Sequence, residues 1–265
     1  MTGKHPDRPV PHPAQSETGT ACRLRSADTA SVSIDVPAGM NADSSRDTAP
    51  ASDTSLGRLH VLTDFHLQKK HAHADLARRA IRGGADTIQF RQKRGGIQNK
   101  LVEARKVAAV CTDASIPLIV DDRIDVAQAV GADGVHLGQE DFPVDAARSI
   151  LGSETIIGAT ATKPHQAVAA HEEGADYIGF GPVFPTTSKR NPKSVKGPEG
   201  LAAACDAVPI PVIAIGGITH DRVRPALEAG AHGVAVLSAV ATANDPEQAT
   251  ARFRASIDGV LRDNE

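Results

Sequence analysis

Short apolar runs alternate with helical stretches from residue 58 onward. Segments such as NKLVEARKVAAVCTDA and KPHQAVAAHEEGA carry apolar residues at helical spacing, and several end at glycine. The apolar and β-branched runs predict eight strands, at residues 59–64, 86–90, 117–121, 133–137, 155–159, 176–180, 211–215 and 233–237. Eight β units, each followed by a helix, within about 205 residues predict one (β/α)8 barrel over residues 57–265. The alternative is a doubly wound open sheet, but no GxGxxG follows the first strand.

Four related phrases recur along this region: GGAD, GADGV, GADYI and GAHGV. Each is typical of a helix that ends at glycine, followed by the start of a strand. They are weak internal repeats of one βα unit. They support the fold and say nothing about function.

Residues 1–56 differ from the rest of the chain. They are rich in Pro, Ser, Thr, Asp and Ala, and they show no usable hydrophobic period. Such a composition buries too little apolar surface to offset the entropy of the chain, so we expect a disordered N-terminal extension. It is either a targeting or docking tail or a dispensable extension, and the composition favours the second.

Composition narrows the function classes further. A net charge of -3 argues against nucleic acid as a partner, because phosphate backbones attract basic surfaces. No apolar run approaches the ~20 residues that a membrane helix needs, and no apolar leader begins the chain. The three cysteines are sparse and widely spaced, which is typical of reduced thiols. We therefore expect a cytoplasmic protein that contacts neither nucleic acid nor membrane.

Two neighbouring strands lead into acidic residues within LIVDDRIDVAQAVGADGVHLGQED, which spans residues 118–141. In a barrel the active site lies at the carboxyl ends of the strands, so Asp122 and Asp141 could meet at one point. Carboxylates combined with water and phosphate oxygens suit Mg²⁺. The alternative is that both residues are helix N-caps, and the spacing alone does not decide between the two.

The same rim carries groups that bind anions. Gly216 and Gly217 follow the seventh strand, where phosphate-binding barrels expose backbone amides; the alternative is a tight turn that needs positive φ. Fixed positive charges and hydroxyl groups come from Arg91, Lys93, Thr186, Ser188, Lys189 and Ser238. Together with a metal they fit a diphosphate, whose departure a metal assists by neutralising its charge.

Other candidates carry less information. His136 near the end of the fourth strand is either a base or a hydrogen-bonded structural histidine. Tyr177 and Phe180 are most simply core residues. The sequence shows no obvious Ser–His or Cys–His pair for nucleophilic catalysis.

From about residue 58 to 260, the chain resembles thiamine phosphate synthases. The matching phrases occur in order: TIQFRQK, LIVDDRIDVAQAVGADGVHLGQED, IIGATA, GADYIGFGPVFPTTSK, IPVIAIGGIT and GVAVLSAV. The resemblance implies a (β/α)8 barrel, and small-molecule substrates. It implies coupling of a hydroxymethylpyrimidine diphosphate to a thiazole phosphate, with release of diphosphate. It also implies a dissociative mechanism, in which diphosphate leaves first and the thiazole nitrogen captures the pyrimidine-methyl cation.

The resemblance also assigns roles to residues. Asp122 and Asp141 would bind Mg²⁺, and Thr160 would lie near the pyrimidine or the diphosphate. The remaining substrate contacts would be Gln89, Arg91, Lys93, Asp121, Thr186, Ser188, Lys189, Gly217, Leu237 and Ser238. Among all these, the resemblance makes Arg91, Lys93, Thr160 and Lys189 the residues that act on the reacting groups.

This chain departs from the family pattern at three positions. Asp121 stands where the family usually has Asn, Thr160 where it has Ser, and Gln92 where it has an acid. Two other functions stay open: a thiazole tautomerase of the same superfamily, and a barrel that binds thiazole phosphate without turnover. Barrels of this kind often self-associate, so a homo-oligomer is a further expectation.

Overall fold

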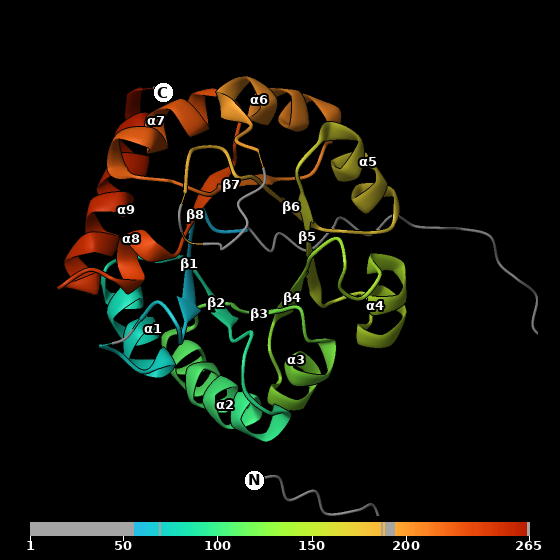
Figure 1. Cartoon of the computed structure of the whole chain (residues 1–265), viewed down its shortest axis with the longest axis vertical. Coiled ribbons are helices and arrows are strands. Elements are labelled where there is room, and N and C mark those ends of the chain that lie inside the picture. Colours follow the sequence, from blue (N-terminus) through green and yellow to red (C-terminus); the bar gives the residue numbers. More distant parts are fainter. Residues whose placement is uncertain (1–55, 69, 187, 189–193, 264–265) are drawn as a thin grey trace, which may run out of the picture. The chain divides into compact units, whose positions relative to one another are not determined.

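Eight parallel strands close into a barrel in the part of the chain described by the computed structural model, residues 56–68, 70–186, 188 and 194–263. Each strand pairs with the next in sequence, and β1 pairs with β8 (Figure 1). The strands are β1 (Leu59–Asp64), β2 (Thr87–Arg91), β3 (Leu118–Asp121), β4 (Gly134–Leu137), β5 (Ile156–Ala161), β6 (Tyr177–Phe180), β7 (Val212–Ile215) and β8 (Gly233–Val236). The prediction of a (β/α)8 barrel is confirmed, and the strand bounds differ from the predicted ones by a few residues.

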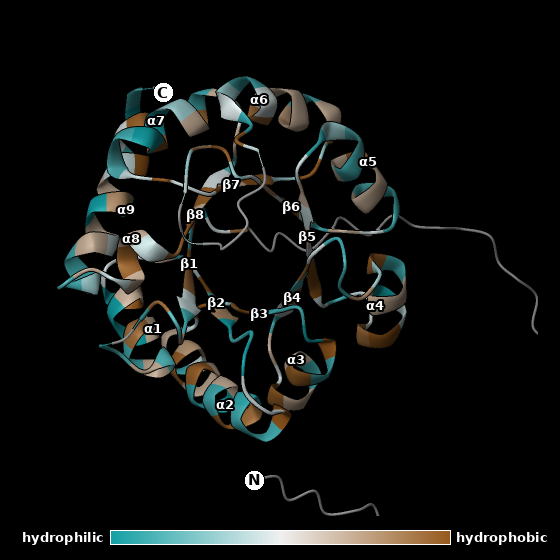
Figure 2. Cartoon of the chain, in the orientation of Figure 1, coloured by the Kyte–Doolittle hydropathy of each residue, from teal (hydrophilic) through white to brown (hydrophobic). Residues whose placement is uncertain are grey.

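Helices surround the strands as an outer ring (Figure 1). They are α1 (His73–Arg82), α2 (Ile97–Ala114), α3 (Ile124–Val130), α4 (Val144–Leu151), α5 (Pro164–Glu172), α6 (Gly197–Ala207), α7 (His220–Glu228), α8 (Ser238–Ala241) and α9 (Pro246–Asp263). The strands are mostly coloured as hydrophobic, whereas the helices alternate between hydrophobic and hydrophilic residues (Figure 2). Among the described residues, no helix is long and apolar enough to cross a membrane.

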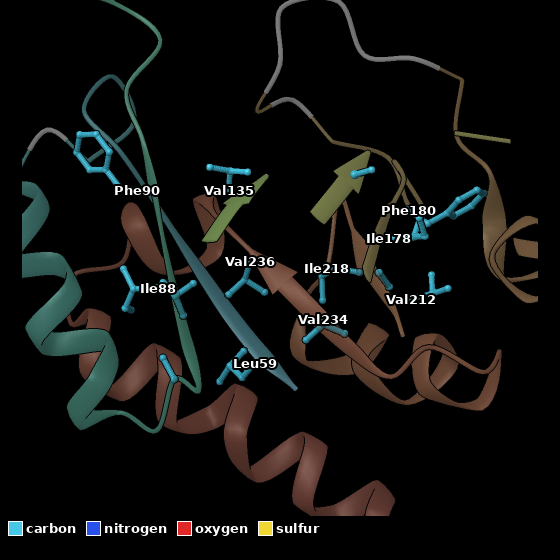
Figure 3. Close-up of a cluster of buried hydrophobic side chains, with 14 of the residues drawn as sticks. Leu59, Ile88, Phe90, Val135, Ile178, Phe180, Val212, Ile218, Val234 and Val236 are labelled. Carbon is cyan, nitrogen blue, oxygen red and sulfur yellow. The ribbon is translucent and has the colours of Figure 1, made fainter. Parts of the chain in front are cut away.

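Successive side chains of each strand point to opposite faces, which separates two apolar layers. The larger layer packs between strands and helices and includes Ile88, Phe90, Ile178 and Phe180 (Figure 3). The smaller layer fills the barrel interior with Leu62, Tyr177, Ile213 and Ala235. Both faces of the strands are therefore buried, which explains why the sequence shows continuous apolar runs instead of an alternating pattern.

The GAD repeats hold the amino-terminal ends of the strands together. Asp86 accepts backbone N–H groups of Arg58 and Leu59, each at 2.9 Å. Asp133 accepts the N–H of Leu118 at 2.7 Å, and Asp176 accepts that of Ile157, also at 2.7 Å. Each carboxylate therefore ties the start of its own strand to the preceding strand.

His232 replaces the aspartate in the fourth repeat. Its Nε2 atom lies 2.6 Å from the carbonyl oxygen of Leu56, and its own carbonyl accepts Arg58 Nη1 at 2.7 Å. The fourth repeat thus joins β8 to the segment before β1, which closes the ring. The predicted N-terminal extension lies almost wholly outside the described residues, and its boundary stays a prediction.

Candidate functional site

A cavity of about 220 Å³ opens at the carboxyl ends of the strands. Side chains from the barrel interior form its floor, among them His60, His136 and Tyr177. Its wall includes many of the residues predicted from the sequence: Gln89, Arg91, Asp121, Thr160, Thr186, Ser188, Gly216, Gly217, Leu237 and Ser238. Residues from β2, β3, β5, β8 and the loops after β6 and β7 thus meet around one space.

Three polar side chains on the cavity floor form a hydrogen-bonded series, which we call the floor chain: Tyr177, His136 and Thr160. The Tyr177 hydroxyl lies 3.0 Å from His136 Nδ1, and the Thr160 hydroxyl lies 2.9 Å from His136 Nε2. Two glycines make room for the rings. A Cβ at position 158 would lie 2.1 Å from the Tyr177 ring, and one at position 179 would lie 2.7 Å from His136.

The floor chain modifies two expectations. Tyr177 belongs to the core, as predicted, but its hydroxyl also takes part in the polar floor of the cavity. The Thr160–His136 contact is a hydroxyl–histidine pair that the sequence did not reveal, because its members are 24 residues apart. The second ring nitrogen of His136 meets a phenol instead of a carboxylate, so the arrangement differs from a nucleophilic triad.

Five charged residues crowd the rim, and we call them the rim cluster: Asp64, Arg91, Lys93, Asp121 and Asp122. Arg91 pairs with Asp64, and its Nε lies 3.3 Å from Asp121 Oδ2. Lys93 pairs with Asp122, and its Nζ lies 3.1 Å from the same Asp121 oxygen. Neither contact of that Asp121 oxygen has hydrogen-bond geometry, although it is buried. Asp64 ends an ordinary apolar strand, and no sequence pattern indicates its role.

Burial and neighbouring charge act in opposite directions in the rim cluster. Burial raises the pKa of Asp121 to about 6, against the opposing effect of Lys93. For Asp122, burial is outweighed by the bond from Lys93, which lowers its pKa below the ordinary value. Burial alone would lower the pKa of Lys93, but Asp121 and Asp122 together raise it. Lys93 therefore stays charged and can bind an anion at this rim.

Asp122 and Asp141 come together, as predicted. Their carboxyl groups interact directly, and burial together with Asp122 raises the pKa of Asp141. Asp122 has φ of 64°, a left-handed conformation that Asp tolerates better than most residues. This turn follows β3 and is fixed by the bond from the Asp122 N–H to the His136 carbonyl at 2.8 Å.

The alternative that these two aspartates are helix N-caps is wrong. The N-cap positions of α3 and α4 are Arg123 and Pro143, and neither helix has a side-chain cap. Asp141 instead accepts the N–H of Gly138 at 2.7 Å, within its own loop. Both carboxylates therefore belong to the rim.

The opposite side of the cavity has glycines and hydroxyl groups. Gly216 and Gly217 have φ of 95° and 66°, and a Cβ at Gly217 would lie 2.4 Å from the Pro185 carbonyl oxygen. The alternative, a tight turn that needs positive φ, is thus present, and both glycines also line the cavity, where their backbone can contact a ligand. Thr186 donates to Ser188 Oγ at 3.3 Å, and Ser188 donates to Ser238 Oγ at 2.9 Å. These three hydroxyls, the hydroxyl cluster, link the loop after β6 to the start of α8.

Not every predicted residue lies in the cavity wall. Lys93, Asp122 and Asp141 lie outside the residues that line the cavity, but the rim cluster connects Lys93 to Asp121, which does line it. Lys189 lies outside the described residues. The cavity thus has carboxylates and cations at one side, and glycines and hydroxyls at the other.

Comparison with known proteins identifies close relatives. A family model described as thiamine monophosphate synthase matches residues 59–240. The thiamine-phosphate synthase of Salinibacter ruber (strain DSM 13855 / M31) is 79% identical over 212 residues, which cover 80% of this chain and 93% of that protein. That of Natronomonas pharaonis is 42% identical over 204 residues, covering 76% and 95%. The solved structure of thiamine phosphate pyrophosphorylase from Pyrococcus furiosus is 40% identical, with a TM-score of 0.70 and coverage of 77% and 96%.

Proposed function

The chain belongs to the thiamine monophosphate synthase family, and from that premise we propose that it couples a hydroxymethylpyrimidine diphosphate to a thiazole phosphate. Thiamine phosphate and diphosphate are the products. This makes the protein a transferase of the thiamine phosphate synthase type. The expected substrates are small molecules, and the expected compartment is the cytoplasm.

The observation that supports this function best is the pairing of two unlike sides around one cavity. Arg91 and Lys93 present positive charge beside Asp122 and Asp141. Gly217 and the hydroxyl cluster lie across the cavity, where they suit a single phosphate. One side therefore fits a diphosphate and the other fits a phosphate, as a coupling of these two substrates requires.

The rim carboxylates fit Mg²⁺. The described residues contain no group of three or more His, Cys, Asp or Glu that could form an all-protein metal cage. Mg²⁺ commonly uses one or two carboxylates and completes its coordination with water and substrate phosphate oxygens. Asp122 and Asp141 are adjacent and repel each other when both are ionised, as the raised pKa of Asp141 indicates. They would hold the metal, which when bound neutralises charge on the departing diphosphate.

The other rim residues bind and orient the substrates in this proposal. Gln89, Arg91, Lys93 and Asp121 surround the pyrimidine diphosphate, and Thr160 contacts the pyrimidine or the diphosphate. Thr186, Ser188 and Lys189 contact both phosphate groups, while Gly217, Leu237 and Ser238 hold the thiazole phosphate. Diphosphate leaves first, and the thiazole nitrogen then attacks the pyrimidine-methyl cation. No protein nucleophile takes part, so the Thr160–His136 pair has a different role.

A coupling assay tests the proposal. Purified protein is given the pyrimidine diphosphate and the thiazole phosphate, with Mg²⁺ or with a chelator, and thiamine phosphate is followed by fluorescence after oxidation. We expect product only with the metal. Absence of product from folded protein would favour the tautomerase or the non-catalytic barrel. Isomerisation of the thiazole phosphate alone would then indicate the tautomerase, and binding without conversion would indicate the non-catalytic barrel.

A further inference from the structure

The available protons determine which atoms of the floor chain donate hydrogen bonds and which accept them. Tyr177 is buried, and burial raises the pKa of its hydroxyl far above the ordinary value, so the group keeps its proton. Among the described residues, His136 Nδ1 is the one acceptor within hydrogen-bond reach of this hydroxyl. If His136 Nδ1 carried a proton, the Tyr177 proton would be buried without an acceptor, which is unfavourable.

The remaining donors follow from this first step. With Nδ1 as acceptor, a neutral His136 carries its proton on Nε2 and donates it to the Thr160 hydroxyl oxygen. The proton of the Thr160 hydroxyl then has no acceptor among the described residues, and Thr160 lines the cavity. This hydroxyl proton is therefore available to an acceptor atom of a molecule in the cavity.

We propose that Tyr177 and His136 are positioning residues, which make the Thr160 hydroxyl a fixed hydrogen-bond donor to an acceptor atom of the bound pyrimidine diphosphate. The inference rests on the proposed function only for the identity of that ligand. The acceptor is a ring nitrogen or a phosphate oxygen. A ligand that offers a donor at this place, instead of an acceptor, leaves the Thr160 proton without a partner and is disfavoured.

Packing around the floor chain holds its side chains in place, so the order of donors and acceptors is kept. Gly158 and Gly179 leave space for the two rings, and any side chain there would displace them. The Tyr177 and His136 rings also contact each other in a tilted arrangement, with ring centroids 5.5 Å apart and planes inclined by 36°. The β-branched Thr160 has fewer side-chain rotamers than serine would have. The added methyl group therefore stiffens the hydroxyl that the two rings orient.

Nuclear magnetic resonance tests the direction without any assay of activity. Long-range nitrogen–proton spectra of the full chain distinguish the two neutral histidine tautomers, and a His136→Gln variant identifies the signals of His136. We expect a proton on Nε2 in the unmodified protein, and loss of that preference in Tyr177→Phe. A proton on Nδ1 in the unmodified protein would overturn the proposal.

A double-mutant cycle tests the coupling to function. Thr160→Val should lower kcat/KM about tenfold, and Thr160→Ser should restore most of it. Tyr177→Phe should lower kcat/KM severalfold in the unmodified protein. In Thr160→Val the same substitution should lower it less than about twofold, because Tyr177 acts through the Thr160 hydroxyl. Equal costs in the two backgrounds would refute a positioning role.

Binding measurements locate the acceptor atom. Calorimetry with inorganic diphosphate and with the pyrimidine alcohol shows which of the two Thr160→Val weakens, and weakening of neither contradicts the proposal. Thr250→Val is the matched control, since Thr250 is buried and donates to the Pro246 carbonyl in α9. Should the unmodified protein form no thiamine phosphate, the proposed function fails, and the tautomer spectra still decide the direction of the floor chain.

Discussion

At the scale of single residues, Asp122 combines an unusual backbone with a charged contact. Its left-handed φ turns the chain directly after β3, and its carboxylate meets both Lys93 and Asp141. A left-handed alanine costs more than a left-handed aspartate or asparagine, whose short polar side chains bond locally. Substitutions at this position therefore separate the backbone requirement from the charge requirement.

We predict that Asp122→Asn lowers turnover more than about a hundredfold through loss of the metal ligand, while thermal unfolding changes little. Asp122→Ala should lose the same activity and some stability as well. Steady-state kinetics over a range of Mg²⁺ concentrations, with calorimetric unfolding, provide the measurement. Asp125→Asn is the control, because Asp125 pairs with Arg123 on the surface. Full activity in Asp122→Asn would remove this residue from the metal site.

A buried histidine gives the fold a pH dependence. Burial lowers the pKa of His60 to about 4, from an ordinary value of 6.5. In the unfolded chain His60 therefore binds a proton below about pH 6.5, whereas in the folded chain it binds one only below about pH 4. The stability that neutral His60 provides is complete above pH 6.5 and is lost as the pH falls toward 4. By pH 5 this loss is about 2 kcal/mol.

We expect His60→Gln to reduce the fall in unfolding free energy between pH 7 and pH 5 by about that amount. Glutamine offers an N–H donor to the Gly57 carbonyl, which His60 Nε2 contacts at 2.9 Å. Urea unfolding at the two pH values measures the effect. His73, whose pKa burial also lowers to about 4, would keep its own contribution in both proteins. An unchanged pH slope would contradict the assignment.

At the scale of elements, one arginine connects α4 to two strand starts. Arg148 donates to the carbonyl groups of Gly152, Thr155 and Gly174, and to the carboxylate of Asp176 at 2.6 Å. Asp176 also accepts the N–H of Ile157 in β5. The end of α4, the start of β5 and the loop before β6 thus share one planar side chain.

Arg148→Lys should lower the unfolding free energy by about 2 kcal/mol, because a lysine ammonium cannot reach acceptors spread around a planar fork. Calorimetry measures this loss as a decrease in Tm of several degrees. The matched control is Arg224→Lys, since Arg224 makes exposed ion pairs with Glu228 and Asp263 and should change little. A similar Tm for both variants would show that Arg148 adds nothing beyond its charge.

The sequence predicts elements better than it predicts contacts between them. Local patterns determine each strand and helix, so the eight strands and the rim positions follow from periodicity and from the rule that active sites lie at strand ends. The left-handed Asp122 and the Asp64–Arg91 pair do not follow, because they depend on groups distant in sequence. The floor chain is a further case: its partners are 24 and 41 residues apart.

At the scale of the whole molecule, the barrel is held from its first described residues. Leu56 packs against the interior layer and its carbonyl contacts His232, while Arg58 bonds to Asp86. The described residues from Leu56 onward form one compact unit. A truncation intended to remove only the N-terminal extension should therefore stop before Leu56.

Deletion of residues 1–55 should leave thiamine phosphate formation and Tm unchanged, because their composition predicts a solvated extension. Deletion of residues 1–58 is the informative contrast, since it removes Arg58, which bonds to Asp86 and His232, and Leu56, which contacts His232, and it should lower Tm. Both proteins are compared by calorimetry and by the coupling assay. If removal of residues 1–55 abolished activity or folding, the extension would be part of the working enzyme.

The aspartates of the GAD repeats lie at one end of the barrel, and the binding groups lie at the other. The bonds that fix strand order therefore share no residue with the groups that select the ligand. Such a separation gives the protein a capacity for evolutionary change. Loops at the carboxyl ends can exchange residues, and so acquire new specificities, without loosening the ends that define the barrel. Libraries restricted to those loops should accordingly contain a large share of folded variants.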